Sequence, residues 1–476
     1  MNNQYIFWDL ETTGRNDKFD QITQVGAVLT NHNFEVKDKL EIHCKLREGK
    51  WFEPGALITT GVDPISLFQN NYPNYYEASA QLYETFQQWS SSPTTFIGFN
   101  NVNFDEPFLR QALYQNLMPE IYMTVTNNNS RMDVFDILRL VSVYSPEHIR
   151  FNVDDQGYPI LKLEEIFKKN NISISYEAGP HDAVFDSLVT LELNKILSIR
   201  CPKIWNAAYN FRLRDTPKKF MLENLVFTNT TFWGRRPTIK AQTLIAGIPG
   251  RNHNYLVFNL LSDPKKLQDL NDDELTKKMN DGTKRICEVF DGSKSKTLLN
   301  ESYCFKDNKY AEIGVDELRT RANFIKKNED LCSRLINLHV ANQKEWPEPF
   351  HVEERIFESF PSHQDKKLMI DFHTAPNNKK FEISQQFKDS RYKEIAIRIL
   401  FEIAPQTLPE NDKRNYELEI RERYNDDDKV KWNSKNKILA SLETDIDKMM
   451  KDEDDKIQFK QRVITFLNTE SAKWSE

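Results

Sequence analysis

The sequence predicts an α/β fold with a mixed sheet, followed by a β-containing region and a helical region. The chain has 476 residues, a length that suits about three domains. Three strand-like runs open the chain and are followed by alternating helix and strand patterns, which is typical of an α/β layer fold. The last part is highly charged and has helical periodicity.

The first two hundred residues carry the clearest patterns. Strands are expected at 5–8, 24–30 and 40–46, the last with clean alternation of apolar and polar residues. Three consecutive strands suggest an antiparallel meander. A further strand is expected at 95–98, and helices are expected at 76–89, 105–115, 132–144, 163–170 and 182–197. These elements define the first predicted domain, residues 1–200.

The pattern changes near residue 200, where Cys201-Pro202 interrupts the helical periodicity. Short strand-like pieces such as 256–260 lie among turns, which predicts a second, β-containing domain over 201–352. Pro347 and Pro349 mark a linker to a third, helical domain over 353–476. Two apolar stripes there are interpreted as helix-packing faces: Ile438, Leu442, Ile446, Met449 and Met450, then Phe459, Val463 and Phe466.

Composition excludes several classes of protein. Lys and Arg total 64 and Asp and Glu total 71, so the net charge of −7 rules out a uniformly basic coat, although not a local basic track. Five cysteines lie far apart without a C-x-x-C pair, which disfavours a disulfide framework or a thiolate zinc site. With 14 glycines, the chain has neither a dinucleotide-binding motif nor a P-loop.

The chain shows neither a signal-peptide pattern nor an apolar run long enough to span a bilayer. Together with the scattered cysteines, this predicts a soluble, cytoplasmic protein without a membrane partner.

Two acids lie two residues apart at the end of the first predicted strand. The strand period places Asp9 and Glu11 on the same face of the sheet. A like-charge pair at ~4 Å costs about 1 kcal/mol in water and about 4 kcal/mol near a protein surface, and a divalent cation removes that cost. Carboxylate oxygens suit Mg²⁺ or Mn²⁺. By itself, however, D-x-E is more often a polar strand end that enters a turn.

Further polar residues follow at the starts of two predicted helices. Asp105 comes directly after a strand, where an aspartate is most simply a helix N-cap. Asp182 is expected to cap the next long helix and His181 to lie in the preceding loop. Asp186 is a charge within a helix that otherwise presents apolar residues to the core, so its position requires a partner.

Taken together, these residues resemble the DEDD exonuclease superfamily, histidine subtype. The segments 54–61, 98–101, 130–133, 154–159 and 181–183 (PGALITTG, GFNN, SRMD, DDQGYP and HDA) are similar to those of the bacterial exonuclease I family. The motif match covers residues 1–200, and the length and three-part layout also fit. The resemblance implies a ribonuclease H-like exonuclease domain, an SH3-like second domain and a helical C-terminal domain.

The resemblance also implies an activity: 3′–5′ degradation of single-stranded DNA to 5′-mononucleotides in DNA repair and recombination. The implied ligands of two Mg²⁺ ions, with Mn²⁺ as a substitute, are Asp9, Glu11, Asp105 and Asp186. His181 would act as general base on the attacking water. Three domains around a strand predict processive action. Single-stranded DNA and single-stranded DNA-binding protein are the expected partners of a monomer.

Substrate contacts implied by the resemblance are Glu11, Lys162, Arg110 and Arg139. Lys162 stands where the family has an arginine, so it keeps the positive charge but loses the bidentate geometry. Arg110 and Arg139 can equally be solvent-facing helix charges.

Residues 201–240 form a local basic track, with eight basic residues against two acids and seven interleaved aromatic residues. Basic groups that follow phosphates and aromatic faces that stack bases suit single-stranded nucleic acid. The proposed contacts within it are Phe232, Trp233, Arg235 and Arg236. The alternative is a solvated basic surface over a core that contains the aromatic residues.

Two other functions remain open at this point. The same chemistry could act on RNA, because the ribose 2′-OH is recognised by local geometry that a sequence does not show. A non-catalytic single-strand-binding or docking module would need the acids only for structure. The presence of all five catalytic residue types disfavours that module.

Overall fold

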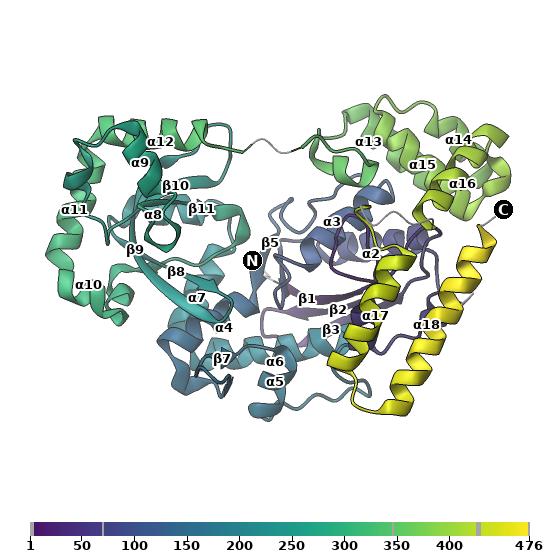
Figure 1. Cartoon of the computed structure of the whole chain (residues 1–476), viewed down its shortest axis with the longest axis horizontal. Coiled ribbons are helices and arrows are strands. Elements are labelled where there is room, and N and C mark those ends of the chain that lie inside the picture. The colour runs from purple at the N-terminus through teal and green to yellow at the C-terminus, as the bar shows by residue number, and fades with distance from the viewer. Residues whose placement is uncertain (1–3, 69–70, 345–346, 425–429, 475–476) are drawn as a thin grey trace.

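A five-stranded mixed sheet lies at the centre of the first unit of the computed structural model, which describes residues 4–68, 71–344, 347–424 and 430–474 (Figure 1). The strands are β1 (Gln4–Thr12), β2 (Ile22–Asn31), β3 (Val36–His43), β4 (Thr94–Gly98) and β5 (Ser130–Asp133), in the order β3-β2-β1-β4-β5. β1, β2 and β3 pair antiparallel, whereas β4 is parallel to β1 and β5. The predicted meander and mixed sheet are confirmed.

Strand β1 is buried on both faces, which explains its unbroken apolar run. Tyr5 and Phe7 face one core, and Ile6 and Trp8 face the other. The helices that cover these faces and complete the unit are α1 (Pro54–Thr60), α2 (Tyr75–Trp89), α3 (Asp105–Gln115), α4 (Val134–Tyr144), α5 (Leu163–Lys169) and α6 (Ala183–Arg200). Short strands β6 (Asn152–Val153) and β7 (Pro159–Ile160) form a small hairpin.

The structure differs from two of these expectations. The helix expected at 132–144 begins only at Val134, because Met132 and Asp133 belong to β5 and the Asp133 carboxylate caps the helix. The strand expected at 40–46 ends at His43, although the side chain of Leu46 beyond it is still buried.

The first core continues past residue 200. Helix α7 (Pro202–Phe211) contributes Ile204 and Ala208, and its N-cap contributes Cys201, to the same apolar cluster as Phe7 of β1. Helix α8 (Thr216–Glu223) follows and leads into the second sheet. The limit drawn at 200 remains a prediction, while the side-chain packing links α7 to the first unit.

The second unit is a curved antiparallel sheet. Its strands are β8 (Phe227–Trp233), β9 (Arg236–Gly247), β10 (Asn254–Asn259), β11 (Cys287–Asp291) and β12 (Leu299–Asn300), in the order β11-β10-β9-β8-β12. Helices pack on it through Leu318, Ala322 and Leu335, which share a core with Leu256 and Phe258. These helices, which the sequence analysis did not predict, are α9 (Asp272–Met279), α10 (Asn308–Ile313), α11 (Val315–Lys327) and α12 (Glu329–Ala341).

The third unit is helical, as predicted, and Figure 1 places it on the side of the first sheet opposite the second unit. Its helices are α13 (His363–Thr374), α14 (Asn377–Ser384), α15 (Ser390–Ile403), α16 (Glu410–Tyr424), α17 (Lys435–Met449) and α18 (Glu453–Lys473). Both predicted stripes pack inward: Ile438 of α17 and Val463 of α18 share a core with Trp51 and Leu57 of the first unit. Met449 is the exception, because it is 42% exposed.

A buried ion cluster joins the third unit together. Glu353 lies in the turn 352–357 and is fully buried. Its Oε1 accepts hydrogen bonds from Arg398 at 2.8 Å and from Arg423 at 2.6 Å. None of the helices in the described ranges combines the length and apolar character needed to cross a bilayer.

Candidate active site

The first part of the site joins β1 to helix α3. The Leu10 amide, between Asp9 and Glu11 on β1, donates a hydrogen bond to Oδ1 of Asp105 at 3.0 Å. Asp105 is the first residue of α3, and the N-cap is Phe104, whose side chain makes no capping bond. The interpretation of Asp105 as an N-cap is therefore wrong, since its carboxylate is turned toward the strand and lies beside the two acids.

The second part of the site is the start of α6. Asp182 caps this helix, as predicted, by accepting hydrogen bonds from Val184 and Phe185. Its Oδ2 also accepts a hydrogen bond of 2.8 Å from Gln24 of β2. In the β1–β2 register Gly26 lies opposite Asp9, and it allows α6 to contact the strand backbone directly. The start of α6 is thus held against the strand that carries the acids.

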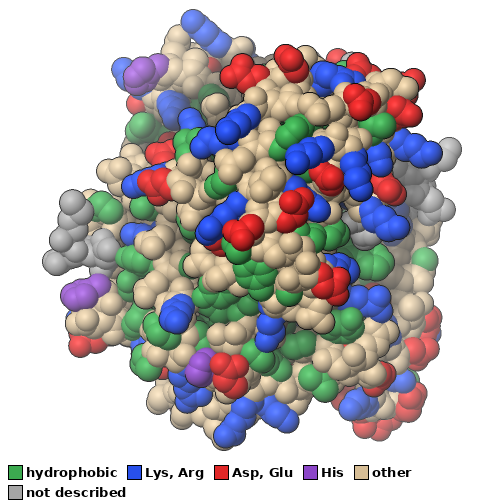
Figure 2. Space-filling view, turned by 90° about the vertical axis from the view of Figure 1, so that its left-hand side faces the viewer, with side chains coloured by type: hydrophobic (Ala, Val, Ile, Leu, Met, Phe, Trp, Pro, Cys, Tyr) green, Lys and Arg blue, Asp and Glu red, His purple; other side chains and the backbone are tan. Residues whose placement is uncertain are grey.

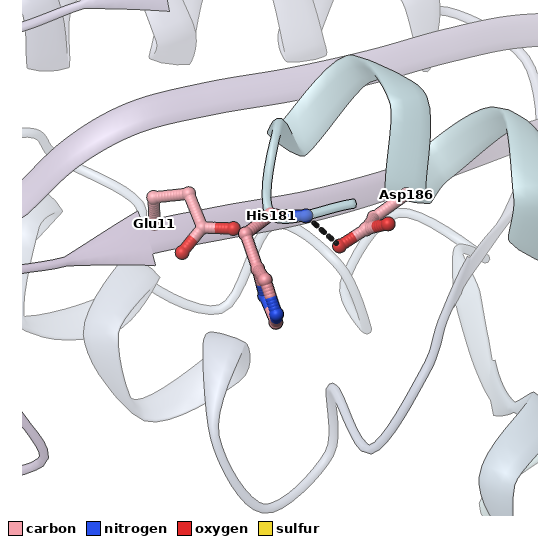
Figure 3. Close-up of side chains that lie close together, drawn as sticks. All are labelled: Glu11, His181 and Asp186. Atoms are coloured by element: carbon pink, nitrogen blue, oxygen red, sulfur yellow. Dashed lines mark hydrogen bonds between the residues drawn. The ribbon is translucent and has the colours of Figure 1, made fainter. Parts of the chain in front are cut away.

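His181 and Asp186 extend from this helix start toward Glu11. The His181 amide donates to Asp186 Oδ2 at 3.2 Å, and Figure 3 shows Glu11 and Asp186 on either side of the histidine. One ligand atom from each of Glu11, His181 and Asp186 lies within 4.8 Å of the others. His181 has a φ of 67°, a left-handed conformation that costs a non-glycine residue energy and that clusters at functional sites.

Burial raises the pKa values of all four carboxylates. Burial and then repulsion from neighbouring acids raise the pKa of Asp9 and Glu11 well above the usual range. Burial raises the pKa of Asp105 to about 7 and that of Asp186 to about 7. Four carboxylates, of which Asp105 is buried and the others are partly buried, form a set of oxygen donors whose charges a divalent cation would stabilise. The residues therefore fit the metal site that the family resemblance implies.

The surroundings of His181 keep its imidazole neutral. Burial lowers its pKa, Glu164 opposes that shift and Lys162 adds to it, so that the pKa lies below its ordinary value. Glu164 Oε2 lies 4.0 Å from His181 Nε2. A neutral imidazole can accept a proton. The sequence analysis missed Glu164, because one acid in a short charged helix has no distinguishing pattern.

A cavity of about 420 Å³ opens beside Glu11 and His181. On one side it is lined by residues 60–63, at the end of the PGALITTG segment. On another side His43 stacks on Tyr72 with ring centroids 5.1 Å apart. We refer to this space as the catalytic cavity because it adjoins the predicted catalytic residues. It brings together segments distant in sequence, so no local pattern predicted it.

Arg110 and Arg139, both predicted substrate contacts, make protein contacts here. Arg110 pairs with buried Glu106 at 3.0 Å and lies over the ring of Tyr122. Arg139 pairs with Asp136 at 3.2 Å and packs over aromatic rings, including that of Phe232 at 5.2 Å. Arg139 therefore lies where the first unit meets the second sheet.

The tip of the β8–β9 hairpin reaches the first unit. Trp233 at the tip is 82% exposed. Arg235 pairs with Asp154 at 3.0 Å, and Arg236 donates to Gln156 at 2.7 Å. The candidate DNA contacts in this hairpin are thus close to the 154–158 turn.

The predicted basic track is divided among several places. Lys203 and Lys219 line a cavity beside α7 and α8, whereas Arg235 and Arg236 lie at the hairpin tip. Phe227, one of its aromatic residues, is fully buried. Figure 2 shows Lys and Arg side chains intermixed with Asp and Glu around apolar side chains, so this face is not a continuous basic surface.

Comparisons with known proteins agree with this geometry. The family model described as the exonuclease I C-terminal domain matches residues 351–469. Exodeoxyribonuclease I of Buchnera aphidicola subsp. Schizaphis graminum is 24% identical over 408 residues, which are 83% of this chain and 82% of that protein.

Two solved structures share the fold. Exonuclease I from Methylocaldum szegediense superposes with a TM-score of 0.84 at 20% identity, covering 98% of this chain and 99% of that one. Escherichia coli exonuclease I in complex with a dA16 oligonucleotide gives a TM-score of 0.82 at 19% identity, covering 98% and 100%. The α/β, SH3-like and helical architecture is confirmed, and the chain is similar to exonuclease I over most of its length, with the family model matching its C-terminal part.

Proposed function

We propose that this protein is a metal-dependent 3′–5′ exonuclease that degrades single-stranded DNA to 5′-mononucleotides. The observation that carries the proposal is the convergence of Glu11, His181 and Asp186 beside Asp9 and Asp105 at one end of β1. The relative from Escherichia coli was solved with a DNA oligonucleotide. A cavity beside this cluster suits the terminal nucleotide of such a strand.

The reaction is hydrolysis of the last phosphodiester bond. His181 accepts a proton from water as the water oxygen attacks phosphorus, and the bond from phosphorus to the 3′-oxygen of the preceding nucleotide breaks. That oxygen takes up a proton, which leaves a new 3′-OH and a free 5′-monophosphate. Two Mg²⁺ ions, held by Asp9, Glu11, Asp105 and Asp186, would stabilise the negative charge on the attacking and leaving oxygens, and Mn²⁺ would substitute for them.

The remaining residues bind the strand. Glu11 faces the cavity for the terminal nucleotide, and Lys162 beside His181 is suited to a phosphate oxygen. Phe232, Trp233, Arg235 and Arg236 would hold the strand farther from its end, and Arg110 and Arg139 would add positive charge for its phosphates. Enclosure by three units would make digestion processive.

Single-stranded DNA-binding protein is a proposed partner, because a related exonuclease I structure is described as a complex with SSB.

A 5′-labelled oligonucleotide tests the proposal. In Mg²⁺ the label should appear in progressively shorter products from the 3′ end, and chelation should stop the reaction. Asp9→Ala should abolish activity, whereas Glu35→Ala, on the exposed β2–β3 turn, should retain it. Full activity in Asp9→Ala would refute the site assignment, and faster digestion of a matched RNA would refute the choice of DNA.

A trap experiment tests processivity. Excess unlabelled DNA added after binding should leave the labelled strand to be digested to the end. Release after each nucleotide would contradict processive action.

A further inference from the structure

A second cavity, of about 500 Å³, lies between the first and third units. The first unit contributes residues 45–48, Phe68 and Asn74, and the third unit contributes side chains from α15, α16 and the end of α18. We refer to this space as the interunit cavity. None of the catalytic carboxylates lines it.

Three chain segments line both the interunit cavity and the catalytic cavity. His43 and Cys44 line the catalytic cavity, and Lys45 lines the interunit cavity. Leu67 and Tyr72 also line the catalytic cavity. Their near neighbours in sequence, Phe68 and Asn74, line the interunit cavity. These segments form a thin wall, so a ligand on one side would contact residues covalently continuous with the other side.

The third unit supplies an aromatic lining to the interunit cavity. The rings of Phe401 and Tyr416 lie 5.0 Å apart, and Trp474 lies 6.4 Å from Phe401. Tyr416 is 8% exposed and lines the cavity. A hydroxyl that faces a cavity can donate a hydrogen bond to a bound polar group or accept one from it.

The charged groups around the cavity are unequally satisfied. Arg47 pairs with Glu402 at 2.7 Å, and Lys473 pairs with Glu470 at 2.6 Å. In contrast, the ammonium of Lys45, a half-buried residue of the lining, has neither an ion pair nor a hydrogen bond to the part of the chain that is described. A cation that no protein acid pairs with can pair with an anionic ligand.

One acid in the lining is available to accept hydrogen bonds. Oε2 of Glu48 accepts long bonds of 3.3 Å from Trp474 and from Tyr424. An anionic ligand must therefore also present a donor, such as a sugar hydroxyl or an amino group, on the side of Glu48.

We propose that the interunit cavity is a second ligand site for a nucleoside 5′-monophosphate and that its occupancy modulates the catalytic cavity. The base would stack on the aromatic lining, the phosphate would pair with Lys45, and Glu48 would accept from the sugar or base. The choice of ligand rests on the proposed function, because this is the chemical class of the product. Linkage then requires that strand binding and mononucleotide binding affect each other equally.

Calorimetric titration of the full chain with dAMP in excess chelator tests the site. Without a divalent cation the acids of the catalytic cluster repel a phosphate, so binding under these conditions reports the interunit cavity. We expect saturable binding of dAMP that Lys45→Met weakens about tenfold or more and Tyr416→Phe weakens several-fold. Lys37→Met, at an exposed β3 lysine paired with Glu35, is the matched control and should bind normally.

Several outcomes would overturn the proposal. These are absence of dAMP binding, or an affinity that is unchanged in both Lys45→Met and Tyr416→Phe. Binding of inorganic phosphate as tight as that of dAMP would overturn the assignment to a nucleotide. If Lys45→Met does not fold, Tyr416→Phe still decides the question, because it removes a single oxygen atom.

A kinetic experiment tests the coupling. In Mg²⁺, dAMP should change the KM for an oligonucleotide in the wild-type protein but to a smaller extent in Tyr416→Phe. An identical response in both would refute the coupling. If the protein binds dAMP in chelator but has no nuclease activity, only the proposed function is refuted. If it has nuclease activity but does not bind dAMP in chelator, only the second site is refuted.

Discussion

Gly26 of β2 and Ala183 of α6 meet backbone to backbone, and a methyl group on Gly26 would lie 2.0 Å from the carbonyl carbon of Ala183. Gly26→Ala must therefore push α6 away from Asp9. We expect it to destabilise the fold by about 1–3 kcal/mol and to reduce activity beyond that effect. Gly247→Ala is the control, since its Cβ would enter open space. Urea unfolding measures the change in stability, and kcat measures the change in activity. Equal stability and equal kcat in Gly26→Ala and Gly247→Ala would contradict this account.

Asp105 accepts a hydrogen bond from the Leu10 amide and also carries a negative charge. Two substitutions separate the effects of the bond and of the charge. Asp105→Asn keeps an oxygen that can accept from Leu10, so the fold should be retained while activity falls about a hundredfold or more. Asp105→Ala should also lower the melting temperature, because the Leu10 amide then loses its partner. An active Asp105→Asn protein would show that this carboxylate does not bind the metal.

Binding of Mg²⁺ should release protons at neutral pH. Asp105 and Asp186 each have a pKa of about 7 without a cation, so each is partly protonated there. A cation favours the charged form, so its affinity should rise as pH rises through 7. Calorimetry in two buffers of different ionisation enthalpy measures the release. Identical apparent enthalpies in both buffers at pH 7 would contradict the prediction.

Trp233→Ala tests the hairpin tip. Removal of an exposed ring that stacks a base should cost about 1–3 kcal/mol of strand binding, which raises KM about tenfold while kcat changes little. Leu222→Ala, at an exposed apolar residue of α8, serves as control. If KM is unchanged, the strand does not contact the tip.

Glu353→Gln tests the buried ion cluster. Burial opposes ionisation of Glu353, but Arg398, Arg423 and Lys50 outweigh it and hold its pKa well below the usual 4.5. Its stabilising contribution is therefore present above pH 4.5 and is lost as pH falls through the lower, folded-state pKa. We expect Glu353→Gln to lower the free energy of unfolding by about 3–5 kcal/mol at pH 7. The stability of the variant should then decline less steeply than that of the wild type as the pH falls.

Urea unfolding across this pH range measures the contribution of Glu353. Glu382→Gln, at an exposed acid of α14, should change stability by less than about 1 kcal/mol. A similar small change in Glu353→Gln would contradict the role of the cluster.

Periodicity predicted the elements whose side chains follow a regular pattern. Helix α3 has the expected bounds, and α2 begins one residue earlier than expected. The helices α11 and α12 were missed, because they lie in a region whose prolines and short apolar runs indicated strands. Their burial depends on the second sheet, which local patterns do not describe.

The candidate site was only partly predictable. Spacing placed Asp9 and Glu11 on one face, and the family resemblance added Asp105. The local sequence alone favours a helix cap for Asp105, because it does not show the Leu10 amide, 95 positions away, that donates to its carboxylate. Glu164 and the catalytic cavity depend on long-range packing, which leaves no local signature. The roles of the site residues remain predictions for the experiments above.

The tip of the β8–β9 hairpin links the first two units only weakly. The pair between Arg235 and Asp154 is partly exposed, so solvent screens it and it adds little stability. A phosphate of an entering strand would compete with Asp154 for the same guanidinium. Arg235 would then exchange the Asp154 carboxylate for the phosphate in a single step. The hairpin would separate from the first unit as it binds the strand, with little net change in charge pairing.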